Sequence, residues 1–149
     1  MASVLDVAAY ILQITGSVTT MKLQKLAYYS QAWSLVWDEK PLFPDSVQAW
    51  VDGPVIPALY QAHKGKFTVR PGDIAGNAHA LTPGEQDVVN RVIEFYGSMT
   101  GQQLSQLSHA EAPWREARQG YGSNEIARIE IPHDRIAAYY ASLNPSAEA

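Results

Sequence analysis

Apolar residues recur at helical spacing along most of the chain. Between Thr19 and Trp37, apolar or small residues stand at positions 23, 26, 27, 30, 33 and 37, which is the i, i+3, i+4, i+7 spacing of one helix face. Lys22 and Lys25 fall mostly off that face. A first helix is expected from Val4 onward, because its apolar residues have the same spacing and Gly16 can end it.

Capping patterns predict several further helices. Thr82-Pro83-Gly84-Glu85 matches a capping box with proline at the first helical position, and residues 100–103 repeat a capping pattern. Prolines at 57, 113 and 132 stand where three more helices can begin. The sequence therefore predicts a mainly α protein, a compact bundle of about five to six helices.

Only short segments favour strands, so at most a small β element is expected, near residues 47-51 and 126-131. Gly53 precedes a proline, which favours extended backbone there. Residues 65–81 are expected to form a long loop, with a possible strand at 67–70. We assign residues 1-144 to a single domain and expect residues 145-149 to be a frayed tail.

Composition narrows the function classes. The chain has 149 residues, of which 46% are hydrophobic, and this is enough for one real core. Its formal net charge is -4 and its eleven Lys and Arg residues are scattered, which argues against direct binding of nucleic acid. No secretory signal and no segment long enough to span a bilayer is found, so a cytoplasmic location and no membrane partner are expected.

The sequence holds no recognisable catalytic or metal-binding motif. It has no cysteine, its four histidines lack metal-ligand spacing, and neither a nucleophile elbow nor a P-loop is present. We therefore expect no catalytic residues, no metal, no cofactor and no enzymatic activity. A small hydrolase or metal enzyme stays open as an alternative if His109 and a nearby carboxylate converge in a cleft.

Four sequence blocks follow one another along the chain: MKLQKLAYYSQA at 21–32, PLF at 41–43, QAWVDGPVIP at 48–57 with Tyr60 after it, and LSQLSH at 104–109 with Pro113-Trp114 after it. Together these blocks resemble the Panacea antitoxin domain family, also called SocA-like or phage-associated GepA-like. The matches span residues 21–118, about two thirds of the chain. Their order makes a chance match very rare.

The resemblance implies a small, mainly helical protein of a bacterium or phage. Members of the family act as antitoxins of type II-like toxin–antitoxin pairs, and each neutralises a cognate toxin encoded nearby by direct protein–protein binding. A branch of the family is associated with delivery of the toxin to a cellular protease. A proteolytic adaptor is therefore the alternative to simple neutralisation.

Candidate functional residues follow from the blocks and their chemistry. We expect Lys22, Lys25, Tyr28, Trp50 and Asp52 to contact the partner or to support the contacting face. Lys22 and Lys25 either lie on a solvated face or pair with carboxylates of a partner or a neighbouring element. Lys25→Glu is expected to weaken partner binding with the fold intact. The expected structural residues of the blocks are Leu23, Leu26, Trp33, Gly53, Pro54, His109, Pro113 and Trp114.

Overall fold

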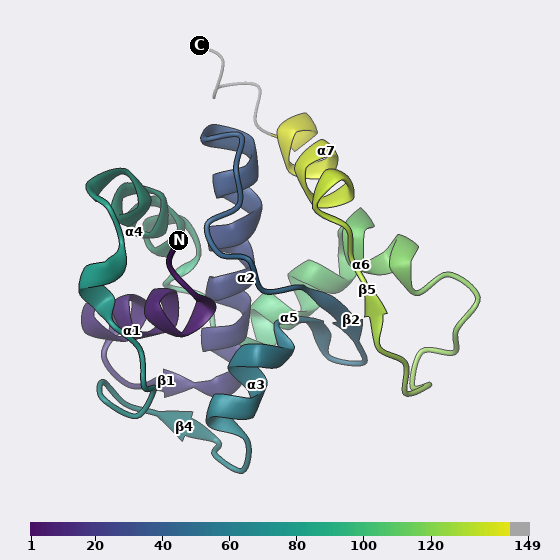
Figure 1. Ribbon diagram of the computed structural model, residues 1–149. Helices are drawn as coiled ribbons and strands as arrows, with labels where there is room; N and C mark the ends of the chain where they lie inside the picture. The colour runs from purple at the N-terminus through teal and green to yellow at the C-terminus, as the bar shows by residue number, and fades with distance from the viewer. Residues whose placement is uncertain (144–149) are drawn as a thin grey trace.

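Helix α2 (Thr20–Trp37) runs through the middle of the protein, and the other long helices pack around it (Figure 1). The structure is a computed structural model and describes residues 1–143. Its further helices are α1 (Val4–Thr15), α3 (Pro57–His63), α4 (Pro83–Tyr96), α5 (Gly101–Ala110), α6 (Ala112–Ala117), α7 (His133–Leu143) and the 3-10 turn η1 (Ala78–Ala80). The predicted mainly α fold is confirmed, with seven α-helices among the described residues instead of five or six.

Helix α2 is buried on every side, which corrects the expectation of one apolar face and one solvated face. All residues from Leu23 to Ser34 are buried, because α1, α4, α5 and α7 enclose the helix. Its buried Gln, Lys and Ser side chains form hydrogen bonds to backbone groups. Gln31, for example, accepts a hydrogen bond from the backbone N–H of Leu42 at 2.7 Å and donates one to the carbonyl of Phe43 at 2.8 Å.

The predicted helix starts are confirmed by their hydrogen bonds. Ser3 and Asp6, Thr82 and Glu85, and Thr100 and Gln103 each form a reciprocal capping box. Thr19 caps α2 by accepting from the N–H of Lys22 at 3.1 Å. Local chemistry therefore determines where these helices begin.

Two small antiparallel sheets complete the fold. Strands β1 (Val18–Thr19) and β4 (Thr68–Val69) form one pair. Strand β2 (Gln48–Trp50) lies between β3 (Gly53–Val55) and β5 (Ile129–Glu130), so the second sheet joins distant parts of the chain. Both predicted β regions are confirmed. The 65–81 stretch, expected to be a long loop with a possible strand at 67–70, carries the short strand β4 at that place and the turn η1 after it.

The turn between β2 and β3 corrects one expectation about the backbone. Trp50 pairs with Gly53, so the hairpin reverses over only two residues, and Gly53 has a φ of 121° instead of ordinary extended backbone. A Cβ atom on Gly53 would stand 2.7 Å from Cε of Lys25. Glycine is needed here both for the positive φ and for the close approach of the lysine.

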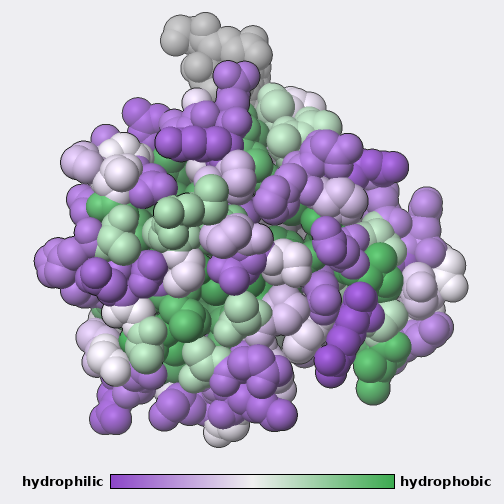
Figure 2. Space-filling view, in the orientation of Figure 1, coloured by the Kyte–Doolittle hydropathy of each residue, from purple (hydrophilic) through white to green (hydrophobic). Residues whose placement is uncertain are grey.

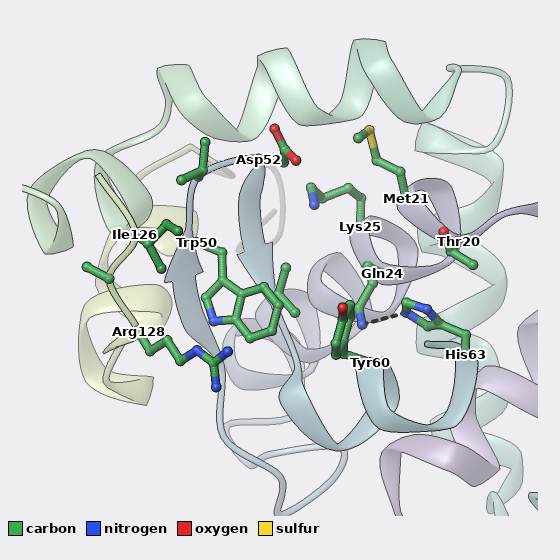
Figure 3. A pocket seen from close by; sticks show the side chains of 13 residues that line it. Thr20, Met21, Gln24, Lys25, Trp50, Asp52, Tyr60, His63, Ile126 and Arg128 are labelled. Carbon is green, nitrogen blue, oxygen red and sulfur yellow. Dashed lines mark hydrogen bonds between the residues drawn. The ribbon is translucent and has the colours of Figure 1, made fainter. Parts of the chain in front are cut away.

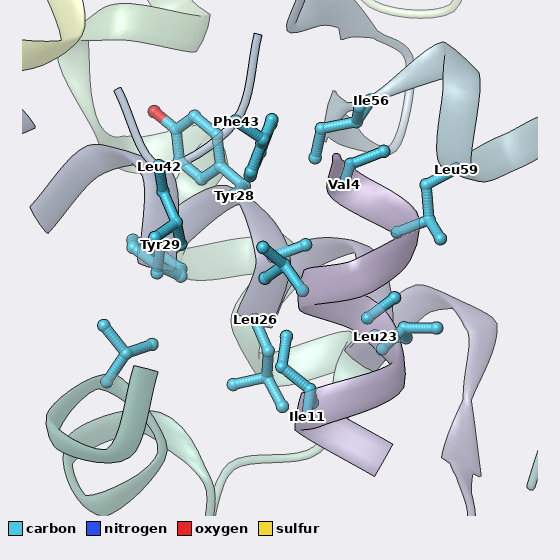
Figure 4. Close-up of a cluster of buried hydrophobic side chains, with 14 of the residues drawn as sticks. Val4, Ile11, Leu23, Leu26, Tyr28, Tyr29, Leu42, Phe43, Ile56 and Leu59 are labelled. Atoms are coloured by element: carbon cyan, nitrogen blue, oxygen red, sulfur yellow. The ribbon is translucent and has the colours of Figure 1, made fainter. Parts of the chain in front are cut away.

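The core lies between α1, α2 and the segments that cover them (Figure 4). One side of it is a cluster of tyrosines around a buried carboxylate. Tyr29 and Tyr140 each donate a hydrogen bond of 2.7 Å to Glu111, and the hydroxyl groups of Tyr28 and Tyr140 lie 3.0 Å apart. This network ties α2 to α7 and to the junction of α5 and α6.

The surface seen in Figure 2 alternates polar side chains with apolar patches. The exposed large apolar residues are Met1, Ile14, Phe67, Phe95, Tyr121, Ile126 and Leu143. No helix within residues 1–143 is both long and apolar enough to cross a membrane. The tail expected at 145–149 lies outside the described residues.

Candidate partner-binding site

A pocket of about 300 Å³ opens between the start of α2, the β2–β3 hairpin, α3 and the segment 126–128 before β5 (Figure 3). Its walls are mostly apolar, and Trp50, Val55, Tyr60 and Met21 contribute to them. Two charged side chains from different family-like blocks, Lys25 and Asp52, also line it. We call this cavity the hairpin pocket.

Lys25 is the buried cation of the hairpin pocket. Its side chain is 1% exposed, and its ammonium donates to the carbonyl oxygen of Pro54 at 3.3 Å. None of the described carboxylates lies within 4.0 Å of the ammonium. Burial lowers the pKa of Lys25 to about 8, and the charge of nearby Asp52 opposes this only in part.

The burial of Lys25 corrects the expectation that Lys25→Glu leaves the fold intact. A glutamate at this position would replace an ammonium group that is 1% exposed by a second carboxylate near Asp52. An unpaired buried charge is strongly destabilising. Charge reversal at Lys25 therefore cannot separate loss of binding from loss of folding.

Trp50 forms the aromatic wall of the hairpin pocket. Its indole N–H donates to the side-chain oxygen of Gln48 at 2.8 Å, which sets the ring's orientation. The ring of Tyr60 meets it edge-on with centroids 5.1 Å apart. The guanidinium of Arg128 lies 5.2 Å from the indole centroid, a cation–π contact. Asp52 stands exposed at the hairpin turn.

Side chains from α2, α5 and α6 form hydrogen bonds that hold the hairpin in place. Gln24 accepts from the N–H of Ile56 at 2.9 Å, next to β3. Ser105 donates to the carbonyl of Asp52 and Trp114 to the carbonyl of Trp50, each at 2.6 Å. Because three family-like blocks contribute to these bonds, blocks far apart in sequence converge on a single hairpin.

The part of the chain that contains these residues also matches a known family. The family model described as "Antitoxin SocA-like, Panacea domain" matches residues 23–115. The chain belongs to this family. It is also 32% identical to "Antitoxin SocA" of Caulobacter vibrioides (strain NA1000 / CB15N) over an alignment of 119 positions, which covers 72% of this chain and 63% of that relative. The chain thus spans less than two thirds of the relative's length. No solved structure matches the chain.

Three of the five residues expected to bind a partner meet in this Panacea domain, since Lys25, Trp50 and Asp52 all line the hairpin pocket. Lys22 lies apart and donates to the carbonyl of Gly97 at the end of α4, at 2.6 Å. Tyr28 is 1% exposed in the tyrosine cluster, so it can only support a contacting face in this conformation. Contact of these residues with a partner stays a prediction.

The expected structural residues of the Panacea blocks are placed as follows. Leu23 and Leu26 are fully buried on α2, and Trp33 is 8% exposed with its indole N–H donating to Tyr96 at 3.0 Å. Gly53 and Pro54 belong to β3 of the hairpin. Pro113 is buried in the first turn of α6, next to Trp114.

His109 stacks on Trp114 with ring centroids 4.1 Å apart, and it does not line the hairpin pocket. Its Nε2 atom is buried without a hydrogen-bond partner among the described residues. Burial lowers its pKa, and the charge of Lys25 lowers it further. No described carboxylate lies within 4.0 Å of the ring. The convergence on which the hydrolase alternative depends is therefore absent from residues 1–143.

Sequence reasoning missed several residues of the site. Gln24 and Tyr60 lie in or next to the family-like blocks, so their block membership could have indicated them. His63 is buried and hydrogen-bonded to Gln24 at 3.0 Å, and Arg128 reaches the pocket from a distant segment. Neither His63 nor Arg128 belongs to a motif, and only the fold brings them to Trp50 and Gln24.

Proposed function

We propose that this Panacea domain is an antitoxin that neutralises a toxin encoded nearby by binding it directly in the bacterial cytoplasm. The observation that carries the proposal is the family match over residues 23–115. The relative from Caulobacter vibrioides is named an antitoxin, and this supports the same class of function here.

The hairpin pocket and its rim are the proposed contact surface. Tryptophan and arginine are the residue types that most often dominate binding energy at protein interfaces, and Trp50 and Arg128 stack on each other at this rim. Ile126, 86% exposed, adds apolar surface beside them. The blocks that define the family hold this surface in shape through the bonds to the hairpin.

Co-expression with the product of the adjacent gene tests the proposal. The toxin alone is expected to stop growth, and this chain is expected to restore growth and to co-purify with the toxin. Absence of both rescue and complex would refute the proposed function. Toxin half-life with and without this chain, compared between a protease-proficient and a protease-null strain, distinguishes the two mechanisms: delivery to a protease shortens the half-life only where the protease is present, and blocking does not shorten it in either strain.

A matched pair of variants locates the contact surface. Trp50→Ala is expected to weaken the complex at least tenfold, because it removes the aromatic wall of the pocket and the ring on which the guanidinium of Arg128 packs. Phe95→Ala is the control, since Phe95 is 79% exposed on α4 and lines a different cavity. Equal affinities of the two variants would place the interface elsewhere, provided that both retain the wild-type melting temperature.

A further inference from the structure

The hairpin pocket contains a charge that the described protein leaves largely uncompensated. An ammonium group has three donors, and the carbonyl of Pro54 at 3.3 Å is the hydrogen-bond acceptor found for Lys25 within residues 1–143. Figure 3 shows the end of the Lys25 side chain directed into the space between Trp50 and Asp52. A buried cation with so little compensation is costly unless something else pairs with it.

Asp52 does not fill this role in the structure. Its residue is exposed, and Ser105 fixes its backbone carbonyl at 2.6 Å on the hairpin turn. Arg128 adds a second positive charge to the pocket. Lys25 and Arg128 each contribute one positive charge to the pocket, Asp52 contributes one negative charge, and His63 is neutral. The side chains that line the pocket therefore carry a net charge of +1.

We propose that the hairpin pocket binds the carboxylate of a single Glu or Asp side chain presented by the protein partner, with Lys25 as its cation. This inference rests on the proposed function, since it names the chemistry by which the partner is recognised. Trp50, Tyr60 and Val55 supply apolar walls against which the methylene groups of the acidic side chain pack. The carboxylate completes the coordination of the Lys25 ammonium.

The size and donors of the pocket favour a side chain over a chain terminus. A volume of about 300 Å³ is at the small end for ligand pockets and suits one side chain. Capture of a C-terminal carboxylate typically uses a nest of backbone N–H groups, whereas Lys25 provides a point charge.

Binding of the acidic side chain is expected to depend on pH above neutrality. The charged or titratable groups around Lys25 are Asp52 on the hairpin, His63 on α3, His109 on α5 and, elsewhere in the pocket wall, Tyr60 and Arg128. Burial lowers the pKa of both histidines, so they stay neutral above pH 7. Lys25, with a pKa of about 8, is then the group that loses its charge between pH 7 and 9.

The main test is the affinity of the full chain for the product of the adjacent gene, measured by titration calorimetry at pH 7. Lys25→Met is expected to weaken binding at least 30-fold. Lys40→Met is the matched control, because it removes one positive charge from an exposed turn outside the pocket, and it is expected to change affinity less than threefold. Raising the pH from 7 to 9 should weaken binding of the wild type but not of Lys25→Met.

Substitution in the partner identifies the ligand group. Replacing each partner Glu by Gln and each Asp by Asn, one at a time, should reveal one substitution that weakens wild-type binding but leaves the affinity of Lys25→Met unchanged. If no single substitution does so, or if only removal of the partner's C-terminal residue does, the inference is overturned. Equal affinities of Lys25→Met and Lys40→Met also overturn it, and the proposed function then still stands.

A second measurement needs no toxin. Butyrate serves as a model of the glutamate side chain and butyramide as its uncharged counterpart, and the pKa of Lys25 is followed by nuclear magnetic resonance. Butyrate is expected to raise that pKa by at least one unit, and butyramide is expected to leave it unchanged. If the wild type forms no complex with the toxin, the proposed function fails. The pKa measurement then decides the inference by itself. An unchanged pKa of Lys25 in butyrate overturns the inference.

Discussion

Replacing Lys25 by methionine should stabilise the protein at neutral pH. The ordinary lysine pKa of 10.5 falls to about 8 on folding, and a pKa difference of one corresponds to about 1.4 kcal/mol, so the buried charge costs about 3 kcal/mol below pH 8. Methionine removes this cost but leaves the carbonyl of Pro54 without its donor, a loss of about 1 kcal/mol. The expected net gain at pH 7 is about 2 kcal/mol.

The stability advantage of Lys25→Met over the wild type should disappear at higher pH. The sign of this change follows from how tightly the folded and unfolded chains bind the Lys25 proton. Between pH 8 and 10.5 the unfolded chain holds the Lys25 proton more tightly than the folded protein does. The stability of the wild type therefore rises with pH in this range, by about 2 to 3 kcal/mol between pH 7 and 10. The tyrosine cluster limits the useful range, because burial raises the pKa of Tyr28 and Tyr29 and the unfolded tyrosines ionise above pH 10.

Urea denaturation of wild type, Lys25→Met and the exposed-lysine control Lys40→Met at pH 7, 8, 9 and 10 checks this reasoning. At pH 7 Lys25→Met should be about 2 kcal/mol more stable than the wild type in urea, and a thermal scan should give it a melting temperature about 4 to 8 °C higher. The difference in stability between these two proteins should shrink steadily toward pH 10. Parallel pH profiles for wild type and Lys25→Met would refute the account of a buried charged lysine.

Three further changes test other parts of the fold, each by chemical denaturation at pH 7. Gly53→Ala should lose about 1–3 kcal/mol more than Gly65→Ala, since both have positive φ but only the first adds a Cβ at 2.7 Å from Cε of Lys25. Trp33→Ala should cost about 3–5 kcal/mol, because it empties a buried site; a loss below 1 kcal/mol would contradict that burial. Burial raises the pKa of Glu111, so wild-type stability should fall as pH rises from the ordinary value of 4.5, and Glu111→Gln should abolish that fall.

Local sequence chemistry predicted the helices well. Capping residues such as Thr82 and Thr100 act within four residues of their partners, so their effect can be read without knowing the fold. The same holds for the short strand that contains Trp50. The family-like blocks also contain the residues of the hairpin that forms one wall of the pocket, although the pairing of its two strands was not predicted.

Burial of polar residues on α2 was not predictable from periodicity. The helix has no clean apolar face, because Gln24, Lys25 and Gln31 interrupt the pattern, and the pattern alone favours a solvated side. These residues are buried because backbone groups of the segments at 42–43 and 54–56 satisfy them. Such partners lie 11 to 32 positions away in the sequence, beyond the reach of local patterns.

The candidate site was predicted only in part for the same reason. Asp52 and Trp50 belong to a motif on a turn, where exposed functional residues are common. Arg128 reaches Trp50 only because β5 pairs with β2 across 80 to 82 positions of the chain. No single-sequence pattern encodes that pairing.

The tyrosine cluster has a consequence for the order in which the chain can fold during synthesis. Tyr28 and Tyr29 emerge early, but their partners Glu111 and Tyr140 are made 82 and 112 positions later. Helix α2 is enclosed by α7 on one side, so a nascent chain that ends before Pro132 leaves that side bare. The core therefore cannot be completed until Tyr140 and the rest of α7 have been translated, and a chain that stops earlier exposes apolar surface that quality-control proteases and chaperones recognise.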